Sequence, residues 1–168
     1  MDLIVDPSGY LHLGAARYRC ALGRGGVKRD KREGDGATPV GSFPLRRLFY
    51  REDRVARPHS ALPSTPLRPS DGWCDDPARP EYNSLVSLPF DGGHEKLWRD
   101  DALYDIVGVI GYNDAPVRSG LGSAIFLHVA TPDYAATEGC VALALGDLHA
   151  VLAQCDPSTS MRIGNPGH

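Results

Sequence analysis

The sequence has no run of about 18 apolar residues, which is the length that a membrane-spanning helix needs. It has no excess of basic residues either. The formal net charge is −3 and the isoelectric point is near 6.0, which argues against nucleic acid as a partner. Internal repeats and low-complexity segments are also absent. The 168 residues, 42% hydrophobic and 23% charged, have the length and composition of one globular domain. We therefore expect a single domain over residues 1–168, without a membrane span, and a monomer.

Cysteine is sparse and lacks the spacing of metal sites. The four cysteines are Cys20, Cys74, Cys140 and Cys155. No two of them form a C-x-x-C pair, so the sequence is not typical of a disulfide scaffold, although one pair could still form. A zinc site built from His128, Cys140, His149 and Cys155 would match no zinc-ligand spacing. We expect neither a metal nor a cofactor.

Three enzyme motifs are missing. His94-Glu95 is followed by Trp98 where the zinc-protease motif H-E-x-x-H needs its second histidine. The phosphate-binding G-x-x-x-x-G-K-[ST] and the papain-type C-G-[SA]-C-[WY] are absent. The start of the sequence, Met1–Asp6, lacks the basic region and the long apolar region of a secretory signal, so we expect no export signal there.

The 19 glycines and 14 prolines favour turns and short strands over long helices. Apolar patterns predict strands at residues 2–5, 10–22, 45–57, 82–88, 103–112, 124–130 and 161–163. Residues 94–98 are expected to begin a helical turn. Leu148, Val151, Leu152 and Cys155 fall at i, i+3, i+4 and i+7, which predicts a helix with one buried face.

The sequence predicts two long loops. Residues 23–44 are rich in glycine and in charge. In this segment Lys28, Arg29, Lys31 and Arg32 either face an anionic ligand or lie in solvent, and solvation is the commoner fate of a charge run. Residues 58–81 are rich in proline with little periodicity, and we expect an ordered loop of which part packs through its tryptophan.

The segment Ser123–Ala142 holds the residues best suited to chemistry. His128 ends an apolar run, and Cys140 follows Gly139 after a turn-rich stretch. A free thiol is mostly protonated at neutral pH, and a nearby imidazole can take its proton. The glycine allows a sharp turn, and the N–H groups of Gly139 and Cys140 could hold a developing oxyanion. The alternative is a core cysteine beside a histidine that satisfies a backbone group, because cysteine is among the most often buried residues.

Two motifs make the sequence resemble a known family. T-P-V-G-S-F at residues 38–43 resembles the T-P-x-G-x-F signature of L,D-transpeptidase catalytic domains of the YkuD type. His128 followed by T-E-G-C-V at residues 137–141 resembles the H-x(n)-[ST]-x-G-C-[hydrophobic] motif of the same family. Both motifs occur in the family's order, and the resemblance covers residues 23–152. Either motif alone is weak evidence, whereas the two together are specific.

The resemblance implies a mostly β fold, a sandwich or barrel-like arrangement with a C-terminal helix packed on it. It implies that Cys140 attacks a peptide bond following the L-centre of diaminopimelate in a peptidoglycan stem, and that His128 is the base. A backbone carbonyl would orient the imidazole. An amine of a second stem, or water, would then take the acyl group from the thioester. The implied partners are donor and acceptor stem peptides, and the implied location is the periplasm or cell wall, although no export signal is visible.

Residues near the strand ends that approach His128 are candidates for substrate binding. They are Arg32, Tyr82, Asn83, His94, Trp98, Arg99, Tyr112, Asn113 and Thr137. Ordinary packing or solvation is the alternative for each of them, and Trp98 is the one best explained as core.

The sequence departs from the family pattern beside the thiol and the imidazole. Ala142 lies where many members have arginine and Val129 where many have glycine, so we expect differences in substrate anchoring. Residues 30–39, D-K-R-E-G-D-G-A-T-P, resemble a short branch associated with cross-links from position 1 of one stem to position 3 of another. Two other functions stay open: hydrolysis of stems by an L,D-carboxypeptidase or endopeptidase, and wall-peptide binding without catalysis.

Overall fold

The computed structural model describes residues 1–164. Within that range the elements are, in order, β1 (Asp2–Asp6), β2 (Tyr10–Leu13), β3 (Ala16–Ala21), β4 (Val27–Lys28), β5 (Thr38–Pro39), β6 (Gly41–Tyr50), β7 (Ser64–Pro66), β8 (Asp71–Cys74), β9 (Leu85–Ser87), β10 (His94–Lys96), β11 (Ile106–Ile110), β12 (Phe126–Val129), β13 (Val141–Leu143), α1 (Leu145–Leu152) and β14 (Ser160–Ile163).

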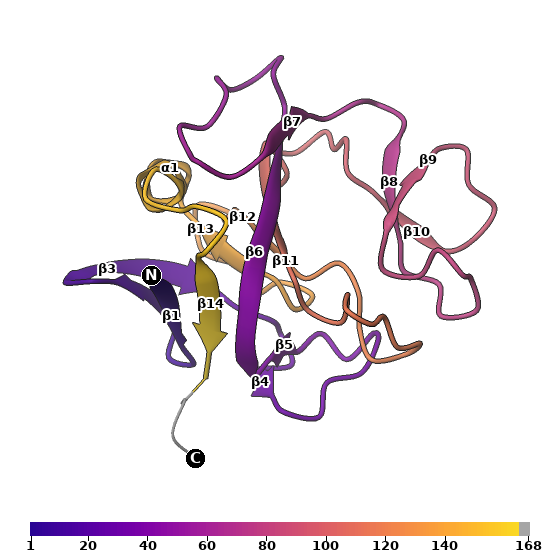
Figure 1. Cartoon of the computed structure of the whole chain (residues 1–168), viewed down its shortest axis with the longest axis horizontal. Helices are drawn as coiled ribbons and strands as arrows, with labels where there is room; N and C mark the ends of the chain where they lie inside the picture. Colours follow the sequence, from indigo (N-terminus) through magenta and orange to yellow (C-terminus); the bar gives the residue numbers. More distant parts are fainter. Residues whose placement is uncertain (165–168) are drawn as a thin grey trace.

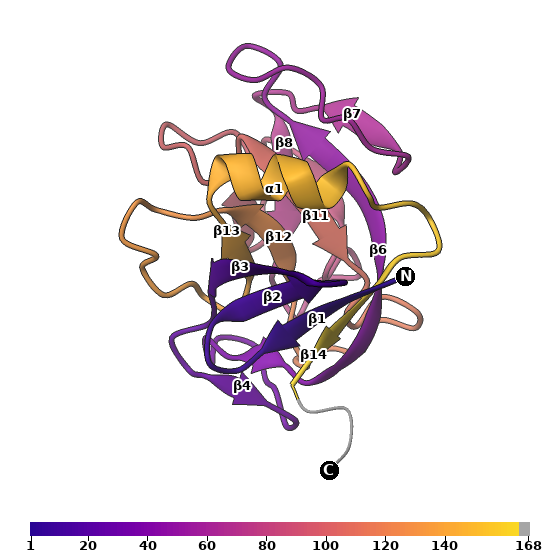
Figure 2. The ribbon, with the colours of Figure 1, turned by 90° about the vertical axis from the view of Figure 1, so that its left-hand side faces the viewer.

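The largest sheet closes on itself. Its strand order is β11-β12-β13-β3-β2-β1-β14-β6-β7, and β11 also pairs with β6. The strands from β11 to β6 therefore form a barrel-like ring, with β7 attached outside it to β6. Figures 1 and 2 show the first and last strands meeting in this ring, where β14 lies between β1 and β6.

Two hydrophobic clusters lie on opposite faces of β11 and β12. The cluster inside the ring takes Ile106 and Ile110 from β11 and Leu127 and Val129 from β12. The second cluster takes the alternate residues, including Phe126, and lies under the loops outside the ring. Strands that are buried on both faces have continuous apolar sequences, as the predicted strands at 103–112 and 124–130 do.

A small three-stranded sheet, β10-β8-β9, covers the outer face of β11 and β12. Figure 1 shows it on the side of β11 away from β1 and β3. Trp73 of β8 attaches this sheet to the ring, because its ring packs edge-on against Phe126 of β12 with centroids 5.1 Å apart. The loops between the small sheet and the ring form the walls of the site described below.

Helix α1 covers the barrel-like ring in the view of Figure 2. Leu148, Val151 and Leu152 form its buried face, and Asp147 lies in its first turn, where the helix dipole favours a carboxylate. The helix ends at Leu152, so Cys155 lies beyond it, although its side chain joins the same hydrophobic cluster. The predicted fold class, mostly β with a C-terminal helix packed on it, is confirmed.

Two sequence predictions about elements are wrong. Residues 94–98 do not begin a helical turn, because His94–Lys96 pair with β8 as strand β10. The strand expected at 45–57 starts earlier and ends earlier, at Gly41 and Tyr50. Its first residues pair with β14, and after Tyr50 the chain turns, with Val55 N–H donating to the carbonyl of Arg51. In both segments, pairing with strands that lie far away in the sequence determines where the strand forms.

The proline-rich segment 58–81 is a long excursion, as expected, but it contains the short strands β7 and β8. Trp73 packs, with 8% of its surface exposed. Among residues 1–164 no helix has the length and apolar character to cross a membrane.

Candidate active site

The alternation of side chains along two neighbouring strands brings His128 and Cys140 to one face. In β12, Leu127 and Val129 point into the ring, so His128 between them points outward. Strand β13 pairs with β12 in parallel, with His128 opposite Ala142. Cys140 lies two residues before Ala142 and therefore shares its outward face. The predicted pair of side chains is thus brought to one side of the barrel-like ring.

The loop that carries Cys140 is held by the other family motif. Thr38 is fully buried, and its hydroxyl accepts the N–H of Gly23 at 2.9 Å. Gly23 in turn forms an isolated bridge with Thr137. Gly139 lies against the carbonyl oxygen of Ala37, from which an added Cβ would be 2.7 Å away. The two sequence motifs are therefore parts of one contact, although they lie far apart in the chain.

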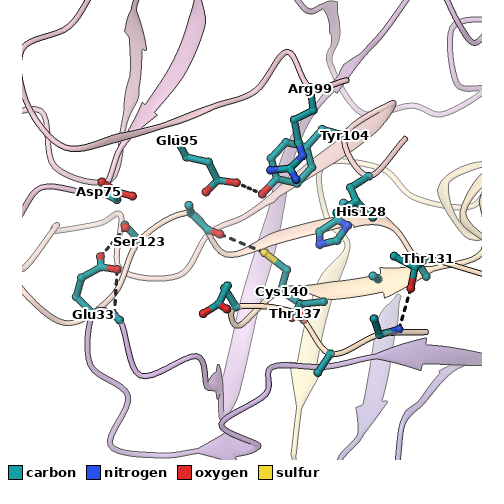
Figure 3. Close-up of a pocket in the computed structure, with 18 of the residues that line it drawn as sticks. Glu33, Asp75, Glu95, Arg99, Tyr104, Ser123, His128, Thr131, Thr137 and Cys140 are labelled. Carbon is teal, nitrogen blue, oxygen red and sulfur yellow. Dashed lines mark hydrogen bonds between the residues drawn. The ribbon is translucent and has the colours of Figure 1, made fainter. Parts of the chain in front are cut away.

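The two side chains open onto a cavity of about 590 Å³. That volume is within the range of small-molecule and peptide sites. The cavity is lined by Lys31, Glu33, Gly34, Asp75, Glu95, Arg99, Leu103, Tyr104, Ser123, Ala124, His128, Ala130, Thr131, Ala135, Ala136, Thr137, Glu138, Cys140 and Ala142. Figure 3 shows the sulfur of Cys140 near the middle of this set, with the imidazole of His128 beside it.

The thiol is held by backbone groups. Its Sγ donates to the carbonyl oxygen of Ala124 at 3.3 Å and accepts the N–H of Phe126 at 3.4 Å. Ala124 has a φ of +54°, which is strained for a residue with a side chain, and its N–H donates to Oδ1 of Asn83 at 3.1 Å. Asn83 therefore fixes the carbonyl that orients the thiol.

The imidazole is held by one carbonyl. Nδ1 of His128 lies 2.9 Å from the carbonyl oxygen of Val129, which can only accept, so Nδ1 carries the proton. In the neutral ring Nε2 is then an unprotonated base. The sequence departure at Val129 leaves this contact intact, because the contact uses the backbone and not the side chain.

Burial keeps both groups uncharged at rest. Desolvation, followed by the charge of Glu95, raises the pKa of the Cys140 thiol to about 12. Desolvation also lowers the pKa of His128, against the opposing effect of the Val129 carbonyl. The resting pair is therefore a thiol and a neutral imidazole, and a proton must move to His128 during any attack by sulfur.

An aromatic side chain covers the imidazole. The ring of Tyr104 lies edge-on to His128, with centroids 5.3 Å apart, and its hydroxyl donates to Glu95. The guanidinium of Arg99 lies 5.3 Å from the centroid of the same Tyr104 ring. Glu95 is largely desolvated, which raises its pKa. Figure 3 shows these groups above the thiol.

The structure places two of the predicted substrate residues in the cavity with Cys140 and His128. These are Arg99, which pairs with Asp101 at 2.7 Å, and Thr137, whose hydroxyl donates to the carbonyl of Cys140 at 2.8 Å. Gly139 is adjacent, and its N–H donates to Oγ1 of Thr137 at 3.1 Å.

The remaining predicted substrate residues do not line this cavity, and their side chains hold loops. Tyr82 donates to Glu33 at 2.6 Å, so it lies directly behind the cavity wall. Asn83 and Asn113 bond to neighbouring backbone, and Tyr112 donates to the carbonyl of Leu121 at 2.5 Å. Nδ1 of His94 lies 2.8 Å from the carbonyl oxygen of Gly92.

Arg32 and Trp98 also lie outside the cavity lining. The side chain of Arg32 is exposed and pairs with Asp30 at 3.0 Å. Trp98 is half-buried, with the guanidinium of Arg51 3.5 Å from its ring centroid. Of the four basic residues in the glycine-rich loop, Lys31 is buried and lines the cavity, whereas Lys28, Arg29 and Arg32 are exposed.

Sequence reasoning missed the acidic and hydroxyl side chains of the cavity. Glu33, Asp75, Glu95, Tyr104 and Ser123 all line it. They come from loops and from segments whose positions depend on tertiary pairing, and apart from Glu33, which lies in the segment 30–39, no motif included them. The one available signal was the tight spacing of charges and glycines around Glu33. Among the described residues no three His, Cys, Asp or Glu side chains are close enough to hold a metal ion together.

A buried thiol and an imidazole thus open onto one cavity of a mostly β fold, and this combination of residues is also found in proteins that use a cysteine nucleophile. The sequence profile of the YkuD family, the L,D-transpeptidase catalytic domain, matches residues 3–163. The chain therefore belongs to this family.

Two solved structures are similar to the chain. One is L,D-transpeptidase 1 of Mycobacterium tuberculosis, with 12% identity, a TM-score of 0.44, and coverage of 98% of this chain and 58% of that one. The other is the helical cell shape determining protein Pgp2 of Campylobacter jejuni, with 14% identity, a TM-score of 0.41, and coverage of 96% and 46%. The chain thus spans about half the length of these two proteins. A comparison with curated protein sequences found no match.

Proposed function

We propose that this protein is a cysteine-dependent L,D-transpeptidase that joins peptidoglycan stem peptides through an acyl-thioester on Cys140. One observation carries the proposal: the thiol of Cys140 and the imidazole of His128 open onto the same cavity from neighbouring strands. Family membership supports the choice of substrate, because the family acts on peptidoglycan peptides.

In the first step the thiol leaves its hydrogen bond to Ala124 and gives its proton to Nε2 of His128. The sulfur attacks the carbonyl carbon of the donor peptide bond. The Val129 carbonyl, held at 2.9 Å from Nδ1, stabilises the imidazolium that forms. The imidazolium then protonates the leaving amine, and the acyl group remains on sulfur. No acidic side chain is needed as a third member of this arrangement.

The oxyanion of the tetrahedral intermediate needs a donor close to the sulfur. The N–H of Gly139 already donates to Thr137. Among residues 1–164 the N–H of Cys140 has no hydrogen-bond partner, so this group is the available donor. Gly139, with a φ of +126°, makes the turn immediately before this N–H.

The acyl-thioester ends by attack of an amine from a second stem, or of water. His128, neutral again after the first step, takes the proton of either attacking group. Transfer to an amine gives a cross-link, and transfer to water gives the L,D-carboxypeptidase or endopeptidase reaction. The balance between the two is set by how well the cavity holds the acceptor.

The segment 30–39 lines the cavity through Lys31 and Glu33. We extend the proposal to links between position 1 of one stem and position 3 of the other, as the resemblance of this segment implies. Family members are normally associated with the cell wall, so we place this activity in the periplasm or wall.

The test is to incubate the protein with purified disaccharide-peptides and to measure products by mass spectrometry. We expect dimers from the wild type and none from Cys140→Ala or His128→Ala. The masses of dimer fragments identify the linked positions, and shortened monomers alone would indicate hydrolysis. A carbapenem should add to Cys140 of the wild type. Dimer formation by Cys140→Ala at the wild-type rate would show that the mechanism is wrong.

A further inference from the structure

The side chain of Asn83 is buried and uses its full hydrogen-bonding capacity. It is 7% exposed. Its Oδ1 accepts the N–H of Ala124 at 3.1 Å and Nε1–H of Trp73 at 3.0 Å. Its Nδ2 donates to the carbonyl oxygens of Tyr112 at 3.1 Å and Asn113 at 2.8 Å. A side-chain amide accepts two hydrogen bonds and donates two, so this one has no bond left to offer a ligand.

The bond from Ala124 to Asn83 holds a strained part of the backbone. Ala124 has a φ of +54°, a left-handed conformation that a residue with a Cβ keeps only where its surroundings hold it. Ala124 is 8% exposed, and among residues 1–164 its N–H has no partner other than Oδ1 of Asn83. Without that oxygen a buried N–H would be left unpaired, which is unfavourable. Asn83 therefore stabilises the backbone conformation of Ala124.

Ala124 in turn holds the nucleophile. Its carbonyl oxygen accepts the thiol of Cys140 at 3.3 Å, the dashed line at the sulfur in Figure 3, and the N–H of Phe126 donates to Sγ at 3.4 Å. Within the described residues Cys140 and His128 form no hydrogen bond with each other. Phe126 is held in β12 by pairing with β11. Ala124 is therefore the partner of the thiol whose position depends on a side chain.

The direction of the thiol matters to the chemical step. Sulfur must face the carbonyl carbon of the donor while its proton passes to Nε2 of His128. A misplacement of about 1 Å can slow such a reaction about 100-fold. With two fixed partners the side chain of Cys140 starts from one position, whereas with one partner it can adopt other rotamers.

We propose that Asn83 is a positioning residue for Cys140, which acts through Ala124 and sets the rate of the chemical step without contacting the peptide. The inference rests on the proposed function, because it concerns how the thiol is aimed at the donor carbonyl. Asn83 does not line the cavity that holds Cys140. Its removal should therefore lower the maximal rate of acylation and leave the affinity for the donor unchanged.

Asn83→Gly is the variant that tests this role. Asn83 has a φ of +58°, which glycine adopts without strain, whereas alanine would add strain of its own. The variant removes the four side-chain hydrogen bonds and keeps the backbone conformation accessible. Residues 122 and 123 keep their contacts with the hydroxyl of Tyr82 and the carboxylate of Glu33, so the loss is confined to Ala124.

Trp73→Phe is the matched control. It removes the other hydrogen bond to Oδ1 of Asn83 and leaves the bond from Ala124 in place. Trp73 lies in β8 and does not line the cavity that holds Cys140. Phenylalanine keeps an aromatic ring against Phe126. Both changes remove a buried hydrogen bond of Asn83, but only Asn83→Gly releases Ala124.

The kinetic measurement follows acylation of Cys140 by a disaccharide-tetrapeptide with intact mass, over a range of donor concentrations. We expect Asn83→Gly to lower the maximal rate about tenfold or more, as for the loss of one buried hydrogen bond, without a change in the half-maximal donor concentration. Trp73→Phe should match the wild type in both. A higher half-maximal concentration with an unchanged maximal rate in Asn83→Gly, or an equal fall in Trp73→Phe, would overturn the proposal.

The second measurement needs no substrate. The infrared S–H stretching band of Cys140 is the difference between the spectrum of each protein and that of its Cys140→Ala counterpart. A thiol that donates a hydrogen bond absorbs at a lower frequency than a free thiol. We expect the lower frequency in the wild type and in Trp73→Phe, and a shift toward the free-thiol frequency in Asn83→Gly. A band that does not shift would mean that Ala124 keeps its place without Asn83, and the proposal would be wrong.

The two measurements separate a failure of this inference from a failure of the proposed function. If no donor acylates the wild type, the proposed function is wrong, and the infrared band still decides whether Asn83 positions the thiol. If the wild type is acylated and Asn83→Gly reacts at the same rate, the positioning role is wrong. The wild-type band needs no variant that must fold, and a free-thiol frequency there would overturn the proposal by itself.

Discussion

The geometry of the site at Gly139 suits glycine and opposes any side chain. Its φ is +126°, and an added Cβ would lie 2.7 Å from the carbonyl oxygen of Ala37 and 3.2 Å from Cδ1 of Ile125. Backbone strain and a backbone clash therefore both oppose any side chain at this position. The tight turn that Gly139 makes comes immediately before Cys140 in the chain.

We predict that Gly139→Ala lowers the stability of the protein by roughly 3 kcal/mol and abolishes acylation of Cys140. The matched control is Gly146→Ala. Gly146 lies in α1 without a neighbour within 4 Å of an added Cβ, so this change should be neutral or slightly stabilising. Thermal unfolding and carbapenem labelling measure the two effects. An unchanged melting temperature for Gly139→Ala would contradict the steric argument.

The thiol of Cys140 should stay protonated across the physiological range. Desolvation and the Glu95 charge raise its pKa to about 12, so the thiolate fraction rises with pH up to that value. We predict that alkylation of Cys140 by iodoacetamide at pH 7.5 is at least about tenfold slower than that of a free thiol of pKa near 8.5. The logarithm of the alkylation rate constant should rise by about one per pH unit, without a plateau below pH 10.

Peptide mapping of the alkylated protein separates Cys140 from the other three cysteines, which are also buried. A plateau near pH 7 would mean a preformed thiolate–imidazolium pair, and the neutral resting pair would then be wrong. Glu95→Gln removes the second cause of the raised pKa, so its alkylation should be faster than that of the wild type at every pH in this range.

At this scale the sequence predicted the pair of side chains but not their surroundings. His128 and Cys140 could be predicted as neighbours because both belong to one family motif, and the structure brings both to one cavity. Tyr104 and Glu95 could not be found, since their approach to the thiol depends on how a small sheet packs on the ring. Their neighbours in sequence carry no trace of that packing.

Among the elements, the loop between β4 and β5 depends most on a single side chain. The carboxylate of Asp35 accepts the ammonium of Lys31 at 2.9 Å, the N–H of Arg32 at 2.8 Å and the N–H of Ala37 at 2.9 Å. Burial by itself would raise the pKa of Asp35, but these hydrogen bonds outweigh it and hold the pKa at about 2. The loop presents Glu33 to the cavity, so its order matters to the site.

We predict that Asp35→Asn destabilises the protein by about 2 kcal/mol at neutral pH. The folded pKa is below the unfolded value, so the contribution is fully present above about pH 4 and is lost as the pH falls toward 2. The melting temperatures of wild type and variant should therefore differ by a constant amount between pH 5 and 8 and converge in acid. Asp30→Asn, an exposed neighbour, is the control and should match the wild type. A difference that grows in acid would contradict the assignment.

The elements were predictable where the pattern was local. The strands at 2–5 and 161–163 and the helix carrying Leu148, Val151 and Leu152 appear as expected. Strand β10 was not predictable, because Glu95 and its neighbours have no strand pattern and form a strand only by pairing with β8. The T-P-V-G-S-F motif could be recognised, yet its role was visible only when Thr38 was seen to hold Gly23 against the Cys140 loop.

On the scale of the whole molecule, the ring of strands closes through the two ends of the described chain. Strand β14 pairs in parallel with β1 and antiparallel with β6, so it joins the first strand to the long strand that supports β11. Met161 of β14 is fully buried, and Ile163 is 2% exposed. Without β14, two strands of the ring would have unpaired edges.

We predict that Met161→Asp destabilises the fold by roughly 4 kcal/mol or more, because it places an unpaired charge in the hydrophobic cluster inside the ring. Arg162→Ala changes the neighbouring residue on the opposite face of the same strand. Its ion pair with Asp2, at 3.0 Å, lies at the surface, so this change should cost less than about 1 kcal/mol. Urea unfolding measures both. Because the cavity residues belong to loops carried by the same ring, Met161→Asp should also lose carbapenem labelling of Cys140, whereas Arg162→Ala should keep it. A Met161→Asp protein that stays folded and reactive would show that the ring does not need β14 to hold the site.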